Sequence, residues 1–288
     1  MIDSKFLIGR RKYEALKSYD FEAMTTDEML FFKKQFNISV AEAEKKIADY
    51  EKHRNKSNTK ANQEYFMKLN STLKIKTKKI TKESLWKLFL YYFKNLEKKE
   101  FITSNEVIEN LKPLFYYFTD DFKNFKKCKR LSGITAPSFE KGLLIVGDFG
   151  NGKSTAMNLL EKCLKNTDKS FKGYTTNYAV NHYEASKSSE DAQFFLKDLC
   201  RGRRYFDDLK TERMVSFYGR KFQLFKDVFE TRDSANLITH ATINYKKNHE
   251  GNLEQAIQEI GEIYGDRVND RIYNMFNIVE FKGSSFRK

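Results

Sequence analysis

The sequence predicts an α/β fold, a parallel sheet flanked by helices, preceded by an all-helical N-terminal domain. Up to residue 130 there are helix-start signals and no strand-like alternation of apolar and polar residues. From about residue 138, apolar strand-like segments alternate with helical ones, as in parallel α/β sheets. A basic run, 123–130, is followed by Ser132-Gly133 and Pro137 between the two patterns. We therefore expect one domain at 1–130 and a second at 131–288.

The N-terminal region has three Ser or Thr residues that stand three positions before a glutamate, the spacing of a helix capping box. These pairs are Thr25 with Glu28, Ser39 with Glu42, and Thr103 with Glu106. Amphipathic stretches follow and predict helices at 29–36, 40–50, 85–96 and 107–118. The aromatic stretch 85–93 is more typical of a helix core than of a surface that stacks bases. The polar stretch 51–62 is expected to be a linker or an exposed helix.

The charge of the chain is unevenly distributed. Its net charge is +14, and residues 1–130 carry 29 Lys and Arg against 18 Asp and Glu, whereas 131–288 carry 24 against 21. A basic surface can indicate an acidic partner such as nucleic acid, although a lysine-rich composition explains it equally well. The distribution favours a basic N-terminal module that contacts DNA or a protein partner.

Targeting and cysteine signals are weak. No apolar run approaches the ~20 residues that a membrane span needs, and the N-terminus lacks the pattern of a secretory leader. Cys128, Cys163 and Cys200 are scattered and have no metal-binding spacing. We expect a cytoplasmic protein with free thiols and no membrane partner.

In the α/β domain the pattern predicts five strands and five helices. We expect strands at 142–147, 172–178, 204–207, 237–243 and 277–281, and helices at 153–165, 190–200, 211–231, 252–261 and 266–275.

Residues 147–154 fit G-x-x-x-x-G-K-[ST], the phosphate-binding loop of nucleotide hydrolases. An apolar run precedes the motif and helical spacing follows it, which is the strand–loop–helix context that it requires. The glycines let backbone N–H groups face phosphates, and the helix adds its positive end. A glycine turn before an ordinary helix is the alternative. The predicted ATP-binding residues are Gly147, Asp148, Phe149, Gly150, Asn151, Gly152, Lys153, Ser154 and Thr155, with Lys153 at the β- and γ-phosphates and Ser154 as a Mg²⁺ ligand.

Two acidic residues, Asp207 and Asp208, end the short predicted strand 204–207. The carboxyl end of a parallel strand lies beside the phosphate-binding loop. We expect Asp207 to hold Mg²⁺ through water and Asp208 to polarise the water that attacks ATP. Because arginines crowd the start of this strand, a surface turn is the alternative.

The predicted strand 237–243 leads to Thr242-Ile243-Asn244. This arrangement would bring an amide near the γ-phosphate and the attacking water. Asn244 is the first choice for this role and Thr242 the second. From spacing alone, an asparagine that caps a turn after a core strand is the better explanation.

Arg267 and Arg271 stand four residues apart and share one face of a predicted helix. An arginine on such a face can be presented to the γ-phosphate of a neighbouring subunit as an arginine finger. Local pairing with Asp266 and Asp270 is the alternative, and spacing does not separate the two.

The order of these motifs resembles the DnaC-type helicase loaders and their IstB-type relatives, AAA+ ATPases of which the second group assists insertion-sequence transposases. The resemblance covers about 138–288, and its most specific part is Tyr264–Arg271, followed by 279–281 and Ser284–Arg287. It implies an AAA+ P-loop NTPase fold with little or no C-terminal lid. It also implies that Arg271, with Arg267 as second candidate, acts in trans and that Arg287 is a sensor in cis. Many AAA+ proteins have glutamate where this chain has Asp208, a difference that bears on the rate of hydrolysis.

Together, the motifs and the resemblance predict a Mg²⁺-dependent ATPase that forms homo-oligomers on single-stranded DNA and loads or remodels a replicative helicase. An IstB-like helper of a transposase is the first alternative. A nucleotide-gated DNA-binding scaffold with negligible turnover is another, and a monomeric P-loop kinase or NTPase without a DNA role is a third. In the family the N-terminal region contacts the helicase or transposase, but here it carries no matching signature.

Overall fold

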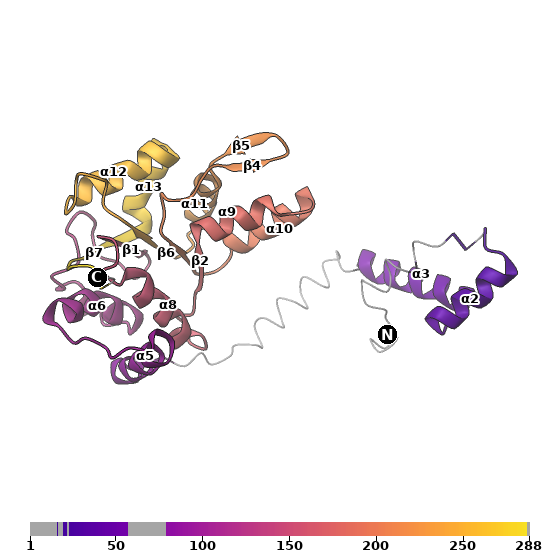
Figure 1. Cartoon of the computed structure of the whole chain (residues 1–288), viewed down its shortest axis with the longest axis horizontal. Coiled ribbons are helices and arrows are strands. Elements are labelled where there is room, and N and C mark those ends of the chain that lie inside the picture. Colours follow the sequence, from indigo (N-terminus) through magenta and orange to yellow (C-terminus); the bar gives the residue numbers. More distant parts are fainter. Residues whose placement is uncertain (1–15, 17–19, 22, 57–78, 287–288) are drawn as a thin grey trace. The chain divides into compact units, whose positions relative to one another are not determined.

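The computed structural model describes Leu16, 20–21, 23–56 and 79–286 of the 288 residues (Figure 1). The chain divides into two compact units, Met1–Lys76 and Thr77–Lys288. Among the described residues, no helix is long and apolar enough to cross a membrane.

The described part of the first unit contains the helices α2 (Thr26–Phe36) and α3 (Val40–Lys56). Both predicted capping boxes are formed, since the Thr25 hydroxyl accepts from the Glu28 N–H and the Ser39 hydroxyl accepts from the Glu42 N–H. Asn37 takes a left-handed conformation and ends α2. A small apolar core forms around Leu16, Phe32 and Ala43. Helix α3 continues to Lys56, so the first part of the polar stretch 51–62 is helical.

The second unit contains a five-stranded sheet in the order β2-β3-β6-β1-β7, and all its pairs are parallel. The strands are β1 (Gly142–Gly147), β2 (Lys172–Thr175), β3 (Arg204–Asp207), β6 (Thr239–Ile243) and β7 (Phe276–Phe281). Every residue of β1, β3 and β6 is buried, as expected for parallel strands that helices cover on both faces. The predicted α/β fold with a parallel sheet is confirmed.

Helices cover the two faces of the sheet in separate groups (Figure 1). One group packs on Leu143 and Ile145, and the other packs on Leu144 and Val146, because successive side chains of a strand point to opposite faces. The first group is α5 (Lys82–Glu97), α6 (Asn105–Phe118), α7 (Phe122–Phe125) and α8 (Lys153–Leu164). The second is α9 (Thr176–Glu184), α10 (Ser189–Leu199), α11 (Leu224–Ser234), α12 (Leu253–Tyr264) and α13 (Asp266–Met275).

The compact units divide between Lys76 and Thr77, whereas the sequence led us to expect a domain boundary at residue 130. The apolar faces of α5 and α6 supply one cover of the sheet: Leu85 and Leu114 are buried in the same core as Ile145 of β1. The aromatic stretch 85–93 contributes to this core, as its spacing indicates. With this division the excess of basic residues is no longer concentrated in the N-terminal part. Residues 1–76 carry 16 Lys and Arg against 11 Asp and Glu, and residues 77–288 carry 37 against 28.

The predicted helix 211–231 is also wrong over its first half. A two-stranded hairpin, β4 (Val215–Phe217) and β5 (Arg220–Phe222), precedes α11. Its turn residues Tyr218 and Gly219 have φ of 47° and 77°, the two positive values that a tight type I′ hairpin turn needs.

Two smaller boundaries differ from prediction. Thr175 caps α9 by accepting from the Tyr178 N–H, so the predicted strand 172–178 ends at residue 175. Ser104, rather than Thr103, caps α6 by accepting from the Val107 N–H.

His240 of β6 is fully buried against Tyr117, Phe118 and Phe171. Its Nδ1 accepts from the Leu143 N–H at 3.1 Å, and its Nε2 has no partner among the described residues. Burial, with a smaller effect of the nearby cations Arg203, Arg232 and Lys169, lowers the pKa of His240 to about 3. The folded protein therefore keeps this imidazole neutral in weak acid.

We predict that the unfolding free energy falls as the pH drops below about 6.5, because the unfolded chain then takes up a proton at His240 that the folded chain refuses. The loss should reach about 2 kcal/mol by pH 5. Urea unfolding of wild type and His240→Gln at pH 7 and pH 5 measures it. His240→Gln should lose this part of the pH dependence, and the exposed His182→Gln should keep it. Equal pH dependence in all three proteins would contradict the assignment.

Candidate nucleotide-binding site

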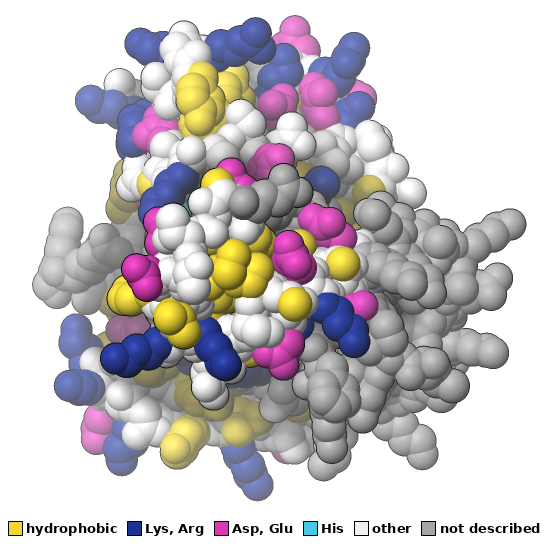
Figure 2. All heavy atoms as spheres, turned by 90° about the vertical axis from the view of Figure 1, so that its right-hand side faces the viewer, with side chains coloured by type: hydrophobic (Ala, Val, Ile, Leu, Met, Phe, Trp, Pro, Cys, Tyr) yellow, Lys and Arg dark blue, Asp and Glu magenta, His cyan; other side chains and the backbone are white. Residues whose placement is uncertain are grey.

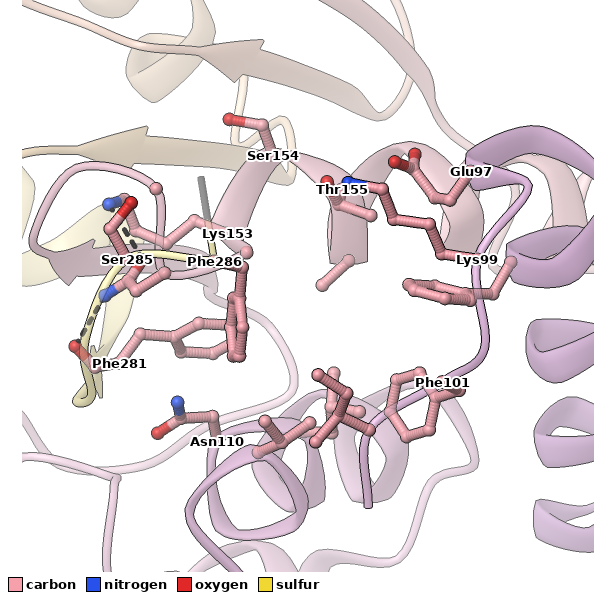
Figure 3. A pocket seen from close by; sticks show the side chains of 18 of the residues that line it. Glu97, Lys99, Phe101, Asn110, Lys153, Ser154, Thr155, Phe281, Ser285 and Phe286 are labelled. Carbon is pink, nitrogen blue, oxygen red and sulfur yellow. Dashed lines mark hydrogen bonds between the residues drawn. The ribbon is translucent and has the colours of Figure 1, made fainter. Parts of the chain in front are cut away.

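The loop between β1 and α8 is bent by two glycines. Gly150 and Gly152 have φ of 77° and 90°, which favour residues without a Cβ. A Cβ on Gly150 would lie 2.2 Å from Ser285 Oγ, so glycine is also required by close packing. The Phe286 N–H donates to the Gly150 carbonyl at 3.0 Å, and Asn151 Nδ2 donates to the Phe281 carbonyl at 3.0 Å (Figure 3). The end of β7 and the residues after it therefore hold the loop in place.

The Lys153 ammonium lies inside this loop with only 6% of the residue exposed. It donates to the carbonyls of Gly147 and Asp148 at 2.8 and 2.7 Å. It also donates to the side-chain oxygens of Asn151 at 3.2 Å and Asn244 at 3.1 Å. A buried ammonium with oxygen acceptors on all sides is positioned to exchange some of these contacts for phosphate oxygens.

Asp207, the first acid, is buried and is contacted by side chains from α8, β3 and β6. Its Oδ1 accepts from Ser154 Oγ at 2.8 Å, from Thr242 Oγ1 at 2.6 Å and from the Tyr205 hydroxyl. Burial raises the pKa of Tyr205, and the neighbouring Asp207 raises it further, so Tyr205 stays a neutral donor. The alternative of a surface turn is therefore wrong for Asp207.

The donor set at this point suits Mg²⁺. Ser154 supplies a hydroxyl oxygen and Asp207 a carboxylate oxygen, the hard ligands that Mg²⁺ prefers, and protein sites usually leave its other positions to water and phosphate. Among the described residues, no group of three or more His, Cys, Asp or Glu could hold a metal by itself. The site therefore fits a metal that arrives with a nucleotide.

Asn244 links Lys153 to Asp208. Its Oδ1 accepts from Lys153, and its Nδ2 donates to Asp208 Oδ1 at 2.7 Å. The capping alternative for Asn244 does not describe these contacts. Thr242 has a role that the sequence did not indicate: its hydroxyl donates to Asp207 and accepts the Asp208 N–H at 2.8 Å, so one side chain connects both acids.

A cavity of about 540 Å³ adjoins the loop (Figure 3). The residues from 150 to 156, with Asp208 and Asn244, line its polar side. The opposite wall carries an apolar group of side chains, and Glu97, Lys99, Glu100 and Asn110 lie beside it. The apolar group consists of Phe89, Phe93, Phe101, Ile102, Val107 and Leu111. This wall comes from α5, α6 and the loop between them, which sequence reasoning had placed in a separate domain. Such a cavity is large enough for a nucleotide and offers an apolar wall for a base.

The predicted arginines lie apart from this cavity. Arg271 Nη1 donates to the Glu230 carbonyl at 3.0 Å and is 3.4 Å from Asp233 Oδ2, both on α11. The predicted local partners Asp266 and Asp270 are not the ones that the structure gives to Arg271. Arg267 is exposed, and neither arginine is among the described residues that line the cavity. Arg287 lies outside the described residues, directly after Phe286, whose ring lies 3.7 Å from a Cβ built on Gly152.

No protein-family model and no curated protein matches this chain. Solved structures that are similar to it include the following three. The DnaC helicase loader is 20% identical over 50% of this chain and 79% of its own, with a TM-score of 0.40. DnaI is 20% identical over 50% and 72%, with a TM-score of 0.38. A putative primosome component from Streptococcus pyogenes serotype M3 is 16% identical over 64% and 84%, with a TM-score of 0.42. The likeness is one of fold.

Thr242→Val should destabilise the protein by about 1–3 kcal/mol, because the buried Asp208 N–H loses its acceptor and Asp207 loses a donor. Thr242→Ser retains the hydroxyl and should keep most of the stability. Urea unfolding at pH 7 measures both. A valine variant as stable as the serine variant would show that the hydroxyl does not connect the two acids.

Proposed function

We propose that this chain is an AAA+ ATPase that assembles on single-stranded DNA and loads or remodels a replicative helicase. The observation that carries the ATPase part is the convergence of Lys153, Ser154, Asp207, Asp208 and Asn244 at the carboxyl ends of β1, β3 and β6. These strands are neighbours in the sheet, which brings residues from 153 to 244 into one site beside a cavity of nucleotide size.

In the proposed reaction, ATP lies with its base against the apolar wall and its phosphates in the 147–154 loop. Lys153 moves from the carbonyls of Gly147 and Asp148 to the β- and γ-phosphate oxygens. Ser154 and Asp207 would hold Mg²⁺, which supplies charge neutralisation at the phosphates.

Asp208 is the proposed base. Its carboxylate, held by Asn244 Nδ2, accepts a proton from the attacking water. The water oxygen forms a bond to the γ-phosphorus as the bond from that phosphorus to the bridging oxygen breaks, and ADP leaves with the electron pair. Asn244 keeps Asp208 and Lys153 on the two sides of the γ-phosphate position.

The proposed assembly would give a role to Arg271 and Arg267, which lie apart from the cavity of their own subunit. Arg271, with Arg267 beside it on α13, reaches the γ-phosphate of an adjacent subunit and stabilises the charge of the transition state. Arg287 is the proposed sensor in cis, because Ser285 and Phe286 already contact the phosphate-binding loop. A homo-oligomer is therefore part of the proposal.

The partner role expected of 1–130 is now proposed for the separate unit 1–76. Hydrophobic side chains of α2 are exposed there, with Leu30 62% and Phe31 69% accessible. Figure 2 shows hydrophobic side chains at the surface with charged ones around them. The helicase role rests on the order of the sequence motifs, and an IstB-like transposition helper remains the second candidate.

The rate of ATP hydrolysis per subunit should rise with protein concentration and with single-stranded DNA, because the arginine finger comes from a neighbour. Arg271→Ala should lower this rate by about tenfold or more. Asp233→Ala is the matched control: it removes the ion pair on α11 but leaves the arginine, so it should retain most activity. A rate that is independent of concentration, DNA and Arg271 would indicate a monomeric NTPase and remove the loader proposal.

Asp208→Asn should lower kcat by about 10²-fold or more while leaving ATP affinity nearly unchanged, since the amide keeps the oxygen that accepts from Asn244 but cannot take a proton. Steady-state hydrolysis and binding of a fluorescent ATP analogue measure the two quantities. The same variant distinguishes a loader that needs ATP hydrolysis from a DNA-binding scaffold that needs only ATP binding. If helicase loading persists at wild-type level in Asp208→Asn, turnover is not needed and the scaffold alternative holds.

A further inference from the structure

Lys210 has a backbone conformation that is unusual for its residue type. It follows Asp207-Asp208-Leu209 directly and has φ of 73°, a left-handed value that favours glycine. Its side chain is nevertheless long and charged, and only 6% of that side chain is exposed. A strained backbone conformation is kept when contacts with the surrounding structure stabilise it. The contacts of the Lys210 side chain are therefore of interest.

The Lys210 ammonium joins the end of β6 to α12. It donates to the main-chain carbonyl of Asn244 at 2.7 Å and forms an ion pair with Glu259 of α12. Burial lowers the pKa of Lys210, while Glu259 opposes this by favouring the charged form. Glu259 therefore favours the charged form of the ammonium, which donates to the Asn244 carbonyl.

The backbone of Lys210 is tied to the same helix. Its N–H donates to the Tyr264 hydroxyl at 3.0 Å, and that hydroxyl donates to Glu212. Tyr264 is the last residue of α12 and lies directly before the segment that carries Arg267 and Arg271. Both the main chain and the side chain of Lys210 thus connect the two acids of the site to α12.

We propose that Lys210 is a positioning residue for hydrolysis: it holds the Asn244 main chain against Glu259, and so keeps the Asn244 amide between Lys153 and Asp208. This inference rests on the proposed ATPase function and adds a residue that does not touch the nucleotide. Positioning of this kind affects the chemical step more than binding, because Lys153 and the loop hold the phosphates independently.

The experiment compares kcat for ATP and the Kd of a fluorescent ATP analogue in full-length Lys210→Met and Lys210→Gly. Glycine suits the left-handed backbone, so Lys210→Gly removes the side chain without conformational strain. Both variants should lose about tenfold or more in kcat, with Kd within about twofold of wild type. Glu259→Gln should behave alike, and the double variant Lys210→Met/Glu259→Gln should fall no further than either single, because the pair acts as a unit.

Lys246→Met is the matched control. Lys246 also pairs with α12, through Glu262 at 2.7 Å, but it is more exposed, and among the described residues its ammonium makes no hydrogen bond to Asn244. The kcat of Lys246→Met should equal that of the wild type.

Three outcomes would overturn the inference. A kcat within about twofold of wild type in Lys210→Gly would show that the side chain is not needed. An equal loss of kcat and of nucleotide affinity would show a merely structural role. A wild type that hydrolyses ATP no faster than Lys153→Ala would overturn the proposed function as well, and this distinguishes the two failures.

Discussion

The carboxylate of Asp207 is the interaction on which the rest of the site depends. Hydroxyl groups from Ser154, Tyr205 and Thr242 all donate to one of its oxygens, so it connects β3 to the start of α8 and to β6. A buried carboxylate without these donors would be costly. With them, it fixes the start of α8 and, through Thr242, the backbone of Asp208. Asp207 and the Asn244 amide, which contacts both Lys153 and Asp208, together hold the phosphate-binding loop and the proposed base in place.

The second constraint is that a parallel sheet must be covered on both faces. Helices α5 and α6 meet this need on one face, and in doing so they place their aromatic side chains at the mouth of the phosphate-binding loop. Asn110 of α6 exchanges two hydrogen bonds with the backbone of Lys282, at 2.7 and 3.1 Å. The same helix thus completes the core, shapes the apolar wall and anchors the residues that follow β7.

The parts of the site that the sequence predicted are those with strong local signals. The glycines at 150 and 152 and the strand before them define the loop without tertiary information, and the two acids stand where a buried strand ends. Amphipathic helices at 85–96 and 107–118 were also recognisable. The surface against which these helices pack was not recognisable. An apolar helix face has the same sequence pattern whether the helix packs within a small helical domain or covers a sheet. For this reason the sequence led us to expect a boundary at 130, whereas the compact units divide between Lys76 and Thr77.

The hydrogen bonds that connect side chains in the site could not be predicted from the sequence, for a related reason. Nothing in the spacing of Thr242 distinguishes a strand threonine from one that bridges two acids, and Lys210 stands where a left-handed backbone would lead one to expect glycine. The hairpin at 215–222 lacked the common Asn-Gly signal, since Tyr218 takes the first positive φ of its turn. Such features depend on contacts between residues that are far apart in sequence.

The pairing of β1 with β7 has a consequence for synthesis of the chain. Leu144 of β1 lies beside Ile278 of β7, so β1, the first strand of the sheet to be synthesised, pairs with the last one. The loop at 147–154 is held by Phe281 and Phe286, which are made later still. A growing chain on the ribosome therefore has no complete nucleotide pocket until residue 286 has emerged, and the apolar face of β1 needs protection until then.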